Sequence, residues 1–122
     1  MAVERQAAAA SAALLEGDDD IAIAAVTIAE LRTGIELAGS RHRAARADFL
    51  VRVLETLPVE PYDVDVAEAH GRLLAYVHRS GTTRGAHDLI IAATAVATRR
   101  TVVTTDRGAR LHELPGVDCV VV

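Results

Sequence analysis

Short apolar runs alternate along the chain with longer segments in which apolar residues recur every three or four positions. Residues 21–26 (IAIAAV) and 101–105 (TVVTT) are runs of the first kind, and their length and composition predict strands of a parallel sheet. Residues 118–122 predict a last strand, and Pro58 and Pro61 bracket a short extended piece. These runs predict a sheet built from short strands.

The segments between the runs have the periodicity and composition of helices. Val66, Ala69, Leu73 and Val77, for example, fall on one face of a single helix. The helices predicted in this way span residues 3–16, 27–38, 42–57, 65–79, 88–99 and 109–114. Strands that alternate with helices predict an α/β fold, a three-layer α/β/α sandwich with a mainly parallel sheet, formed by residues 1–122 as a single domain.

Composition narrows the class of protein. The chain has 122 residues, enough to bury a core without disulfides, and Cys119 is its single cysteine. Lysine is absent, which excludes a P-loop nucleotide site, and the formal net charge of −4 argues against a protein that coats nucleic acid non-specifically. The longest apolar stretches are about half as long as a membrane span requires. We therefore expect a cytoplasmic protein with no membrane partner.

Three acidic residues fall where an α/β fold places a ligand site, around the carboxyl ends of its strands. Glu30 lies in the first turn of the helix after residues 21–26, Asp106 directly follows residues 101–105, and Asp88 opens the helix that leads into that second strand. If the three carboxylates meet, their mutual repulsion makes a divalent cation the natural partner. Oxygen ligands without Cys or His favour Mg²⁺ or Mn²⁺.

Each of these acids also has an interpretation that involves no ligand. Thr27-x-x-Glu30 fits a capping box, in which the glutamate satisfies a backbone N–H at a helix start. Asp88 fits an N-cap of its own helix, and Asp106 in Thr-Thr-Asp-Arg-Gly suits a turn. Both sets of interpretations stay open from the spacing of the residues alone.

Arg32, Arg84 and Arg107 each lie within a few residues of one of these acids. They are candidates for contacts to phosphate groups beside a cleavage site, and ordinary surface arginines are the alternative.

Three segments occur in a fixed order: Ala25-Val-Thr-Ile-Ala-Glu30-Leu-Arg-Thr-Gly34, Gly85-Ala-His-Asp88-Leu-Ile-Ile-Ala-Ala93 and Val103-Thr-Thr-Asp106-Arg-Gly108. Together they resemble the PIN-domain ribonucleases, and most of all the VapC toxins of toxin–antitoxin modules. The resemblance places Glu30, Asp88 and Asp106 on the second, third and fourth acidic positions of the family. It places Thr104 on the threonine of the family's Thr-x-Asp motif.

The chain departs from the family at its N-terminal end. The first acidic position of the family follows a first strand in the centre of the sheet, and nothing similar precedes Val3. We therefore expect a PIN-like domain whose first strand and first acid are missing, supplied by another chain, or lost in a degenerate domain. A start assigned too late, or a truncated chain, is the explanation we favour.

The resemblance implies an endoribonuclease toxin that hydrolyses RNA phosphodiesters with a water activated by Mg²⁺ or Mn²⁺. Glu30, Asp88 and Asp106 are then the catalytic and metal-binding residues, and we assign substrate binding to Thr104, Arg84 and Arg107. The resemblance also implies a homodimer and a VapB-type antitoxin as partner. The alternative is a catalytically inactive PIN-like module that only binds an antitoxin. A phosphoacceptor receiver domain would need a first-strand acidic pair and a lysine, and neither is found.

Overall fold

The computed structural model describes residues 21–122, which divide into two compact units at the bond between Glu60 and Pro61. The helix predicted for residues 3–16 and the acidic turn at residues 18–20 lie outside the described residues. The single-domain organisation predicted for residues 1–122 stays a prediction.

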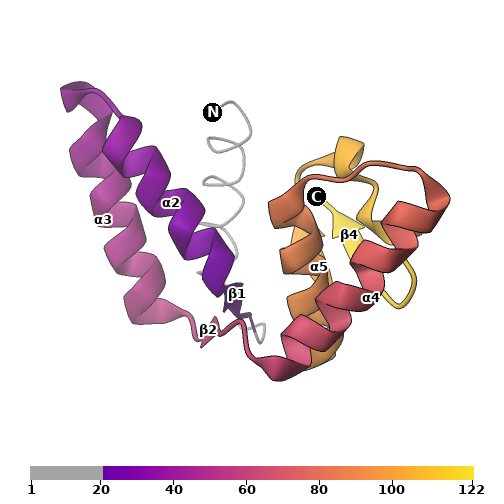
Figure 1. Ribbon diagram of the computed structural model, residues 1–122. Coiled ribbons are helices and arrows are strands. Elements are labelled where there is room, and N and C mark those ends of the chain that lie inside the picture. The colour runs from indigo at the N-terminus through magenta and orange to yellow at the C-terminus, as the bar shows by residue number, and fades with distance from the viewer. Residues whose placement is uncertain (1–20) are drawn as a thin grey trace. The chain divides into compact units, whose positions relative to one another are not determined.

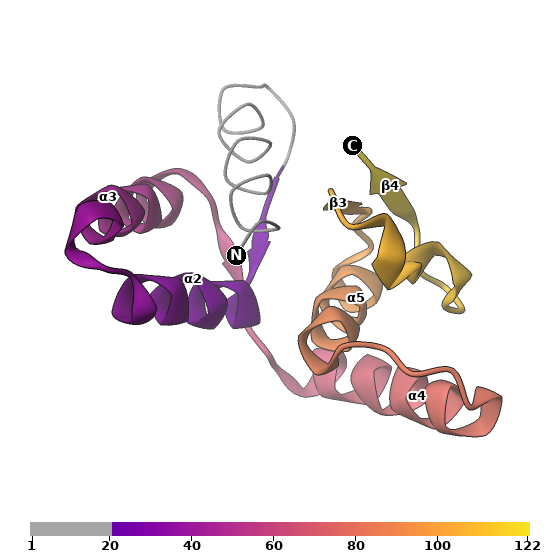
Figure 2. The same ribbon diagram turned by 90° about the horizontal axis from the view of Figure 1, so that it is seen from above.

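The first unit is a helical hairpin whose ends carry two short parallel strands (Figure 1). β1 (Ile23–Ala24) leads into α2 (Ala25–Leu37), and α3 (Ser40–Thr56) leads into β2 (Val59–Glu60). Figures 1 and 2 both show α2 and α3 side by side. The connection between the two helices is short because Ala38 and Gly39 are both extended and end the helical conformation.

Two arginines of α3 fix the hairpin by binding the carbonyl end of α2. Arg43 Nη2 donates to the carbonyl oxygens of Glu36 and Ala38 at 3.2 and 3.1 Å, and Arg46 Nη1 donates to that of Gly34 at 3.1 Å. The last carbonyls of a helix have no partner within the helix, so these bonds supply what the backbone alone lacks. They also place positive charge at the negative end of the helix dipole.

The second unit packs a pair of helices and a pair of parallel strands together. α4 (Val64–Ser80) is followed by α5 (Ala86–Thr98), β3 (Val102–Thr104) and β4 (Cys119–Val121), and Figure 2 labels all four. β3 pairs with β4 in parallel, from Val102 opposite Cys119 to Thr104 opposite Val121. Between the strands the chain forms two 3-10 turns, η1 (Arg107–Ala109) and η2 (Leu111–Glu113).

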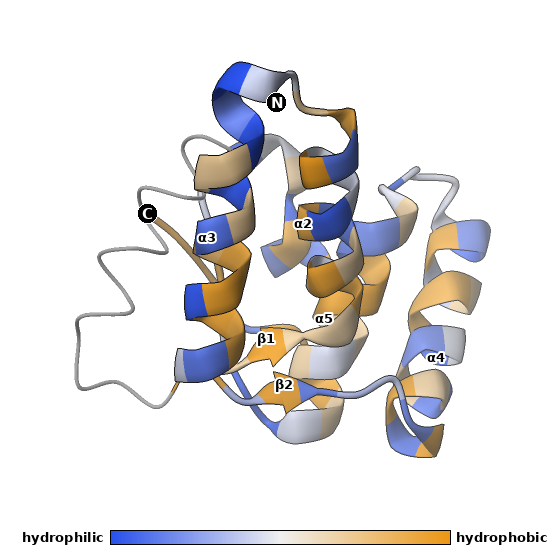
Figure 3. Cartoon of the chain, turned by 90° about the vertical axis from the view of Figure 1, so that its left-hand side faces the viewer, coloured by the Kyte–Doolittle hydropathy of each residue, from blue (hydrophilic) through white to orange (hydrophobic). Residues whose placement is uncertain are grey.

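The core of the second unit is centred on α5, which is rich in alanine. Ala92 and Ala93 have no exposed surface, and Leu89 is almost fully buried. Apolar side chains of α4, β3 and the 3-10 turns surround them: Val66, Ala69, Leu73, Val102, Ala109, Leu111 and Leu114. Figure 3, coloured by hydropathy, shows the apolar character of α5 in orange. Alanine lets the neighbouring elements approach α5 closely, so the residues at its N-terminal end are held on a well-packed base.

The α/β class and the parallel pairing predicted from the sequence are confirmed, and several boundaries are corrected. The strand predicted at residues 21–26 is limited to Ile23–Ala24, because the helix already begins at Ala25. A short apolar run does not distinguish a buried strand from the start of a buried helix. The helix predicted at residues 109–114 is replaced by η1 and η2, which Arg110 separates with a left-handed backbone.

Among residues 21–122, no helix is both long and apolar enough to cross a bilayer.

Candidate functional site

Asp88 lies in the first turn of α5, and its carboxyl group is half-buried. The N-cap of this helix is Gly85, which makes no side-chain cap bond, so the interpretation of Asp88 as an N-cap is wrong. Instead the carboxyl group turns back against the preceding backbone. A Cβ atom built on Gly85 would lie only 2.8 Å from Asp88 Oδ2 and 3.4 Å from Cγ. Glycine at position 85 therefore leaves the space that the Asp88 carboxyl group occupies.

Asp106 follows the end of β3 by two residues and caps the 3-10 turn η1. Its Oδ1 accepts hydrogen bonds from the backbone N–H of Gly108 at 2.9 Å and of Ala109 at 3.3 Å. The N–H of Asp106 itself donates to Thr104 Oγ1 at 3.0 Å. The turn interpretation of Asp106 is thus confirmed. Both of these capping bonds end on Oδ1, so the turn role leaves the second oxygen, Oδ2, for another partner.

The structure brings Asp88 and Asp106 together within the second unit. Burial raises the pKa of the Asp88 carboxyl group above its ordinary value, and the negative charge of Asp106 raises it further. The neighbouring His87 acts in the opposite direction. Each effect follows from the ionised carboxylate losing water contact or facing a charge. A half-buried carboxylate beside a second carboxylate is a site where a cation would bind favourably.

Glu30 lies on α2 in the first unit, one turn later than predicted. The helix begins at Ala25 and has no acidic residue in its first turn, so Glu30 is the sixth residue of the helix and is half-buried. The N-cap is Ala24 and no side chain caps this end, so the capping box predicted from Thr27 and Glu30 is wrong. The grouping of Glu30 with Asp88 and Asp106 stays a prediction.

The three arginines near the acids have different surroundings. Arg32 is exposed and faces Glu36 one helical turn away, with Nη1 and Oε1 3.9 Å apart. Arg107 is exposed in η1, next to Asp106. The side chain of Arg84 is only 6% exposed, and its Nη2 lies 3.5 Å from Glu113 Oε1. Of the two arginines assigned to substrate binding, Arg107 is the one with an open guanidinium group.

The donor set suits a hard divalent cation, although the pair is not a full set of ligands. Asp88 and Asp106 offer carboxylate oxygens only, which are the ligands that Mg²⁺ and Mn²⁺ prefer. Among residues 21–122, no three acidic, histidine or cysteine side chains gather closely enough to hold a metal ion. The residues therefore fit a magnesium or manganese ion that takes further ligands from water, substrate or another carboxylate.

The PIN domain family matches residues 2–115 of this α/β chain. The chain therefore belongs to the PIN domain family. Within that family it belongs to the VapC type. It is 35% identical over 102 residues to "VapC ribonuclease Y4jK" of Sinorhizobium fredii. The aligned residues cover 80% of this chain and 71% of that relative.

Two further comparisons agree with this assignment. "Ribonuclease VapC5" of Mycobacterium tuberculosis is 40% identical over 91 residues, which cover 72% of this chain and 65% of that protein. A solved structure described as a member of the VapBC family of toxin-antitoxin systems, VapBC-5 from Mycobacterium tuberculosis, is 34% identical. It superposes with a TM-score of 0.76 over 83% of this chain and 81% of that chain.

Sequence reasoning missed two residues that shape the site, Gly85 and Glu113. A glycine at the N-cap, three residues before an aspartate in the first turn of the helix, is a weak signal that the carboxyl group needs space there. The ion pair of Glu113 with Arg84 joins residues 29 positions apart, and no local spacing indicates it.

Proposed function

We propose that the chain is an endoribonuclease toxin of a toxin–antitoxin module, which hydrolyses RNA phosphodiester bonds and depends on Mg²⁺ or Mn²⁺. The observation that carries the proposal is the pairing of Asp88 with Asp106, two carboxylates of which one is half-buried and faces the charge of the other. The names of the VapC relatives, both ribonucleases, support the substrate class. The VapBC structure supports a VapB-type antitoxin as partner.

The proposed role of Glu30 comes from the resemblance to the family, and the roles of the other residues are supported by the positions of their side chains. Glu30, Asp88 and Asp106 hold the divalent cation, which when bound neutralises charge on the phosphate and acidifies the attacking water. One of the carboxylates accepts the proton of that water. Thr104 Oγ1 accepts from the Asp106 N–H, so the Thr104 hydroxyl hydrogen is available to a phosphate oxygen. Arg107 is exposed beside Asp106 and supplies positive charge to the substrate backbone.

The test is cleavage of a mixed RNA substrate with Mg²⁺, with Mn²⁺ and with EDTA, by the wild type and by Asp88→Asn. We expect metal-dependent cleavage that Asp88→Asn reduces by at least about a hundred-fold, because one ligand is lost. Asp65→Asn is the matched control, since Asp65 is the acidic residue in the first turn of α4 and is exposed. The products should carry 5′-phosphate and 3′-hydroxyl ends, because this hydrolysis does not use the 2′-hydroxyl group. Cyclic-phosphate ends would contradict the mechanism.

The second candidate function is an inactive module that only binds an antitoxin. The observation that favours it is that Asp88 and Asp106 by themselves offer fewer oxygen ligands than the octahedral set that a magnesium ion requires. Titration with Mn²⁺ separates the two candidates. An active site should bind the ion in a way that Asp88→Asn abolishes, whereas the inactive module should bind it equally poorly with and without the substitution. The homodimer predicted from the family is tested separately, by sedimentation equilibrium of the free chain.

A further inference from the structure

An ion pair connects the segment before Asp88 with the segment after Asp106. Arg84 Nη2 lies 3.5 Å from Glu113 Oε1, and the Arg84 side chain is only 6% exposed. Arg84 Nη1 also donates to the carbonyl oxygen of Thr83 at 3.2 Å, which fixes the guanidinium group to its own loop. Removing the Arg84 guanidinium group from water to pair it with a carboxylate costs free energy of desolvation, so this ion pair points to a role beyond solubility.

On one side of the ion pair, the connection to Asp88 is direct. Arg84 is followed by Gly85, whose Cα faces the Asp88 carboxyl group closely enough that a Cβ would be 2.8 Å from Oδ2. Gly85 is also the N-cap of α5, and its carbonyl oxygen accepts the first helical bond, from the Leu89 N–H at 3.1 Å. The place of Arg84 therefore sets the place of the backbone against which the Asp88 carboxyl group rests.

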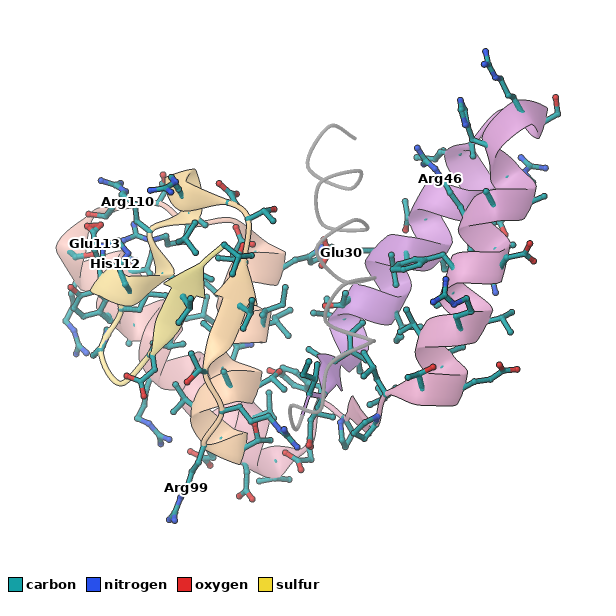
Figure 4. All side chains as sticks on the ribbon, turned by 180° about the vertical axis from the view of Figure 1, so that it is seen from behind. Glu30, Arg46, Arg99, Arg110, His112 and Glu113 are labelled. Atoms are coloured by element: carbon teal, nitrogen blue, oxygen red, sulfur yellow. The ribbon has the colours of Figure 1, made fainter. Side chains whose placement is uncertain are left out.

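On the other side, a continuous series of backbone bonds connects Glu113 to Asp106. The Glu113 N–H donates to the Arg110 carbonyl oxygen at 3.1 Å, and the Arg110 N–H donates to that of Arg107 at 3.3 Å. Arg107 begins η1, which Asp106 caps through its side chain. Figure 4 labels Arg110 and Glu113 in this segment, and Arg110 Nε is a second partner of Glu113 Oε1, at 3.5 Å.

We propose that Arg84 and Glu113 are positioning residues, whose ion pair holds the segments that carry Asp88 and Asp106 at the separation needed to share one divalent cation. The part of the proposal that concerns the cation rests on the proposed function. Such a connection is needed because Asp88 and Asp106 carry charges of the same sign. Two carboxylates repel each other, and Asp88, on a helical first turn, and Asp106, before a 3-10 turn, belong to different elements, so a bond between their segments opposes their separation. Arg84 thus acts through Asp88 and does not need to contact the substrate.

The experiment compares Glu113→Gln with Arg110→Gln as its matched control. Glu113→Gln removes the charge that binds Arg84, whereas Arg110→Gln removes only the more exposed second partner of the same carboxylate. Arg84→Lys is a milder variant that keeps the positive charge, in case Glu113→Gln does not fold. Each variant is crystallised without metal, and its affinity for Mn²⁺ is measured by calorimetry beside wild type and Asp88→Asn.

We expect the carboxyl groups of Asp88 and Asp106 to lie about 1 Å or more further apart in Glu113→Gln, and the Kd for Mn²⁺ to rise about ten-fold. Arg110→Gln should change neither, although both variants lose some thermal stability. The charge-reversed pair Arg84→Glu with Glu113→Arg should recover part of the affinity that Glu113→Gln loses. Unmoved carboxyl groups in Glu113→Gln would overturn the proposal.

A wild type that binds Mn²⁺ no better than Asp88→Asn contradicts the metal site of the proposed function. In that case the crystallographic separation of the two carboxyl groups still decides whether Arg84 and Glu113 position them.

Discussion

Gly85 and Thr104 act on the two aspartates from the backbone side, one by leaving space and one by accepting a hydrogen bond. Gly85 has an ordinary backbone conformation, with φ −59° and ψ 138°, which alanine adopts without strain. Gly85 therefore matters because a side chain at this position would collide with Asp88 Oδ2. A substitution of Gly85 should thus displace the carboxyl group without straining the backbone.

We expect Gly85→Ala to keep the fold and to weaken Mn²⁺ binding about ten-fold, because the new Cβ displaces the Asp88 carboxyl group. The control is Gly71→Ala, since a Cβ there meets nothing within 4 Å. Gly71 lies inside α4, so alanine should raise the free energy of unfolding by up to about 1 kcal/mol and leave the affinity unchanged. Calorimetric titration measures the affinity, and equal affinities for wild type and Gly85→Ala would contradict the prediction.

Thr104→Val removes the acceptor of the Asp106 N–H while keeping the shape of the side chain. We expect the free energy of unfolding to fall by about 1 kcal/mol, as for the loss of one hydrogen bond in a partly buried place. Thr104→Ser, which retains the hydroxyl group, should fall by less. Urea unfolding followed by circular dichroism measures both, and equal losses in the two variants would show that the methyl group matters more than the bond.

At the residue scale, what the sequence could predict depended on how local the interaction is. The turn role of Asp106 is confined to residues 106–109, and Thr-Thr-Asp-Arg-Gly indicates it directly. The partner of Arg84 could not be predicted, because Glu113 reaches it only after the chain has passed through α5, β3 and two 3-10 turns.

Among the helices, α4 has the most complete set of end signals. Asp63 accepts a hydrogen bond from the Val66 N–H at 3.0 Å, Asp65 lies in the first turn, and Gly81 ends the helix with φ +68°. α4 also supplies one wall of the core around α5. The stability of the second unit should therefore respond to the ends of this helix.

We expect Asp63→Ala to lower the free energy of unfolding by about 1 kcal/mol, because an orphan N–H at the helix start loses its acceptor. Asp65→Ala, two residues further on, loses only a favourable interaction with the helix dipole and should cost less. Thermal denaturation compares the two. An equal cost for both substitutions would mean that the charge and not the cap stabilises the helix.

At the element scale, the type of each long helix was predictable and the ends were not. The stripe of Val66, Ala69 and Leu73 has a period that only a helix satisfies, and α4 forms over those residues. The run at residues 21–26 carries no such period, so the change from strand to helix at Ala25 had no signal. The composition of this run does not indicate the residue at which the backbone changes from the extended to the helical conformation.

For the whole molecule, Asp88 makes stability depend on pH. Burial, and then the charge of Asp106, raise its pKa in the folded chain above the ordinary value near 4. The folded state therefore favours the protonated carboxyl group. The stability that this group contributes is fully present below its unfolded-state pKa and is lost as the pH rises through the raised folded-state pKa.

We expect Asp88→Asn, which carries no charge at any pH, to be more resistant to urea than the wild type near pH 7. The difference should shrink as the pH falls below about 4, where the wild-type carboxyl group becomes protonated in both states. Urea unfolding of the metal-free protein in EDTA measures it across the pH range. A difference that stays constant with pH would contradict the assignment of the raised pKa to this residue.

The sequence predicted the α/β class for the whole chain because strands and helices alternate throughout it, and this pattern does not depend on any single contact. It also singled out Asp88 and Asp106 as candidate ligands of one site, but it did not establish that they meet, because the connection from helix to strand does not by itself bring Asp88 to the end of that strand. A meeting of Glu30, in the other unit, with this pair stays a prediction.

The like-charged pair of Asp88 and Asp106 has a consequence for selection on this protein. Asp88→Asn removes an unfavourable interaction and should make the metal-free fold more stable, so selection for stability alone would not preserve a charge at this position. A cation bound by both carboxylates would offset their repulsion. A gain in melting temperature on adding Mn²⁺, absent in Asp88→Asn, would measure that stabilisation.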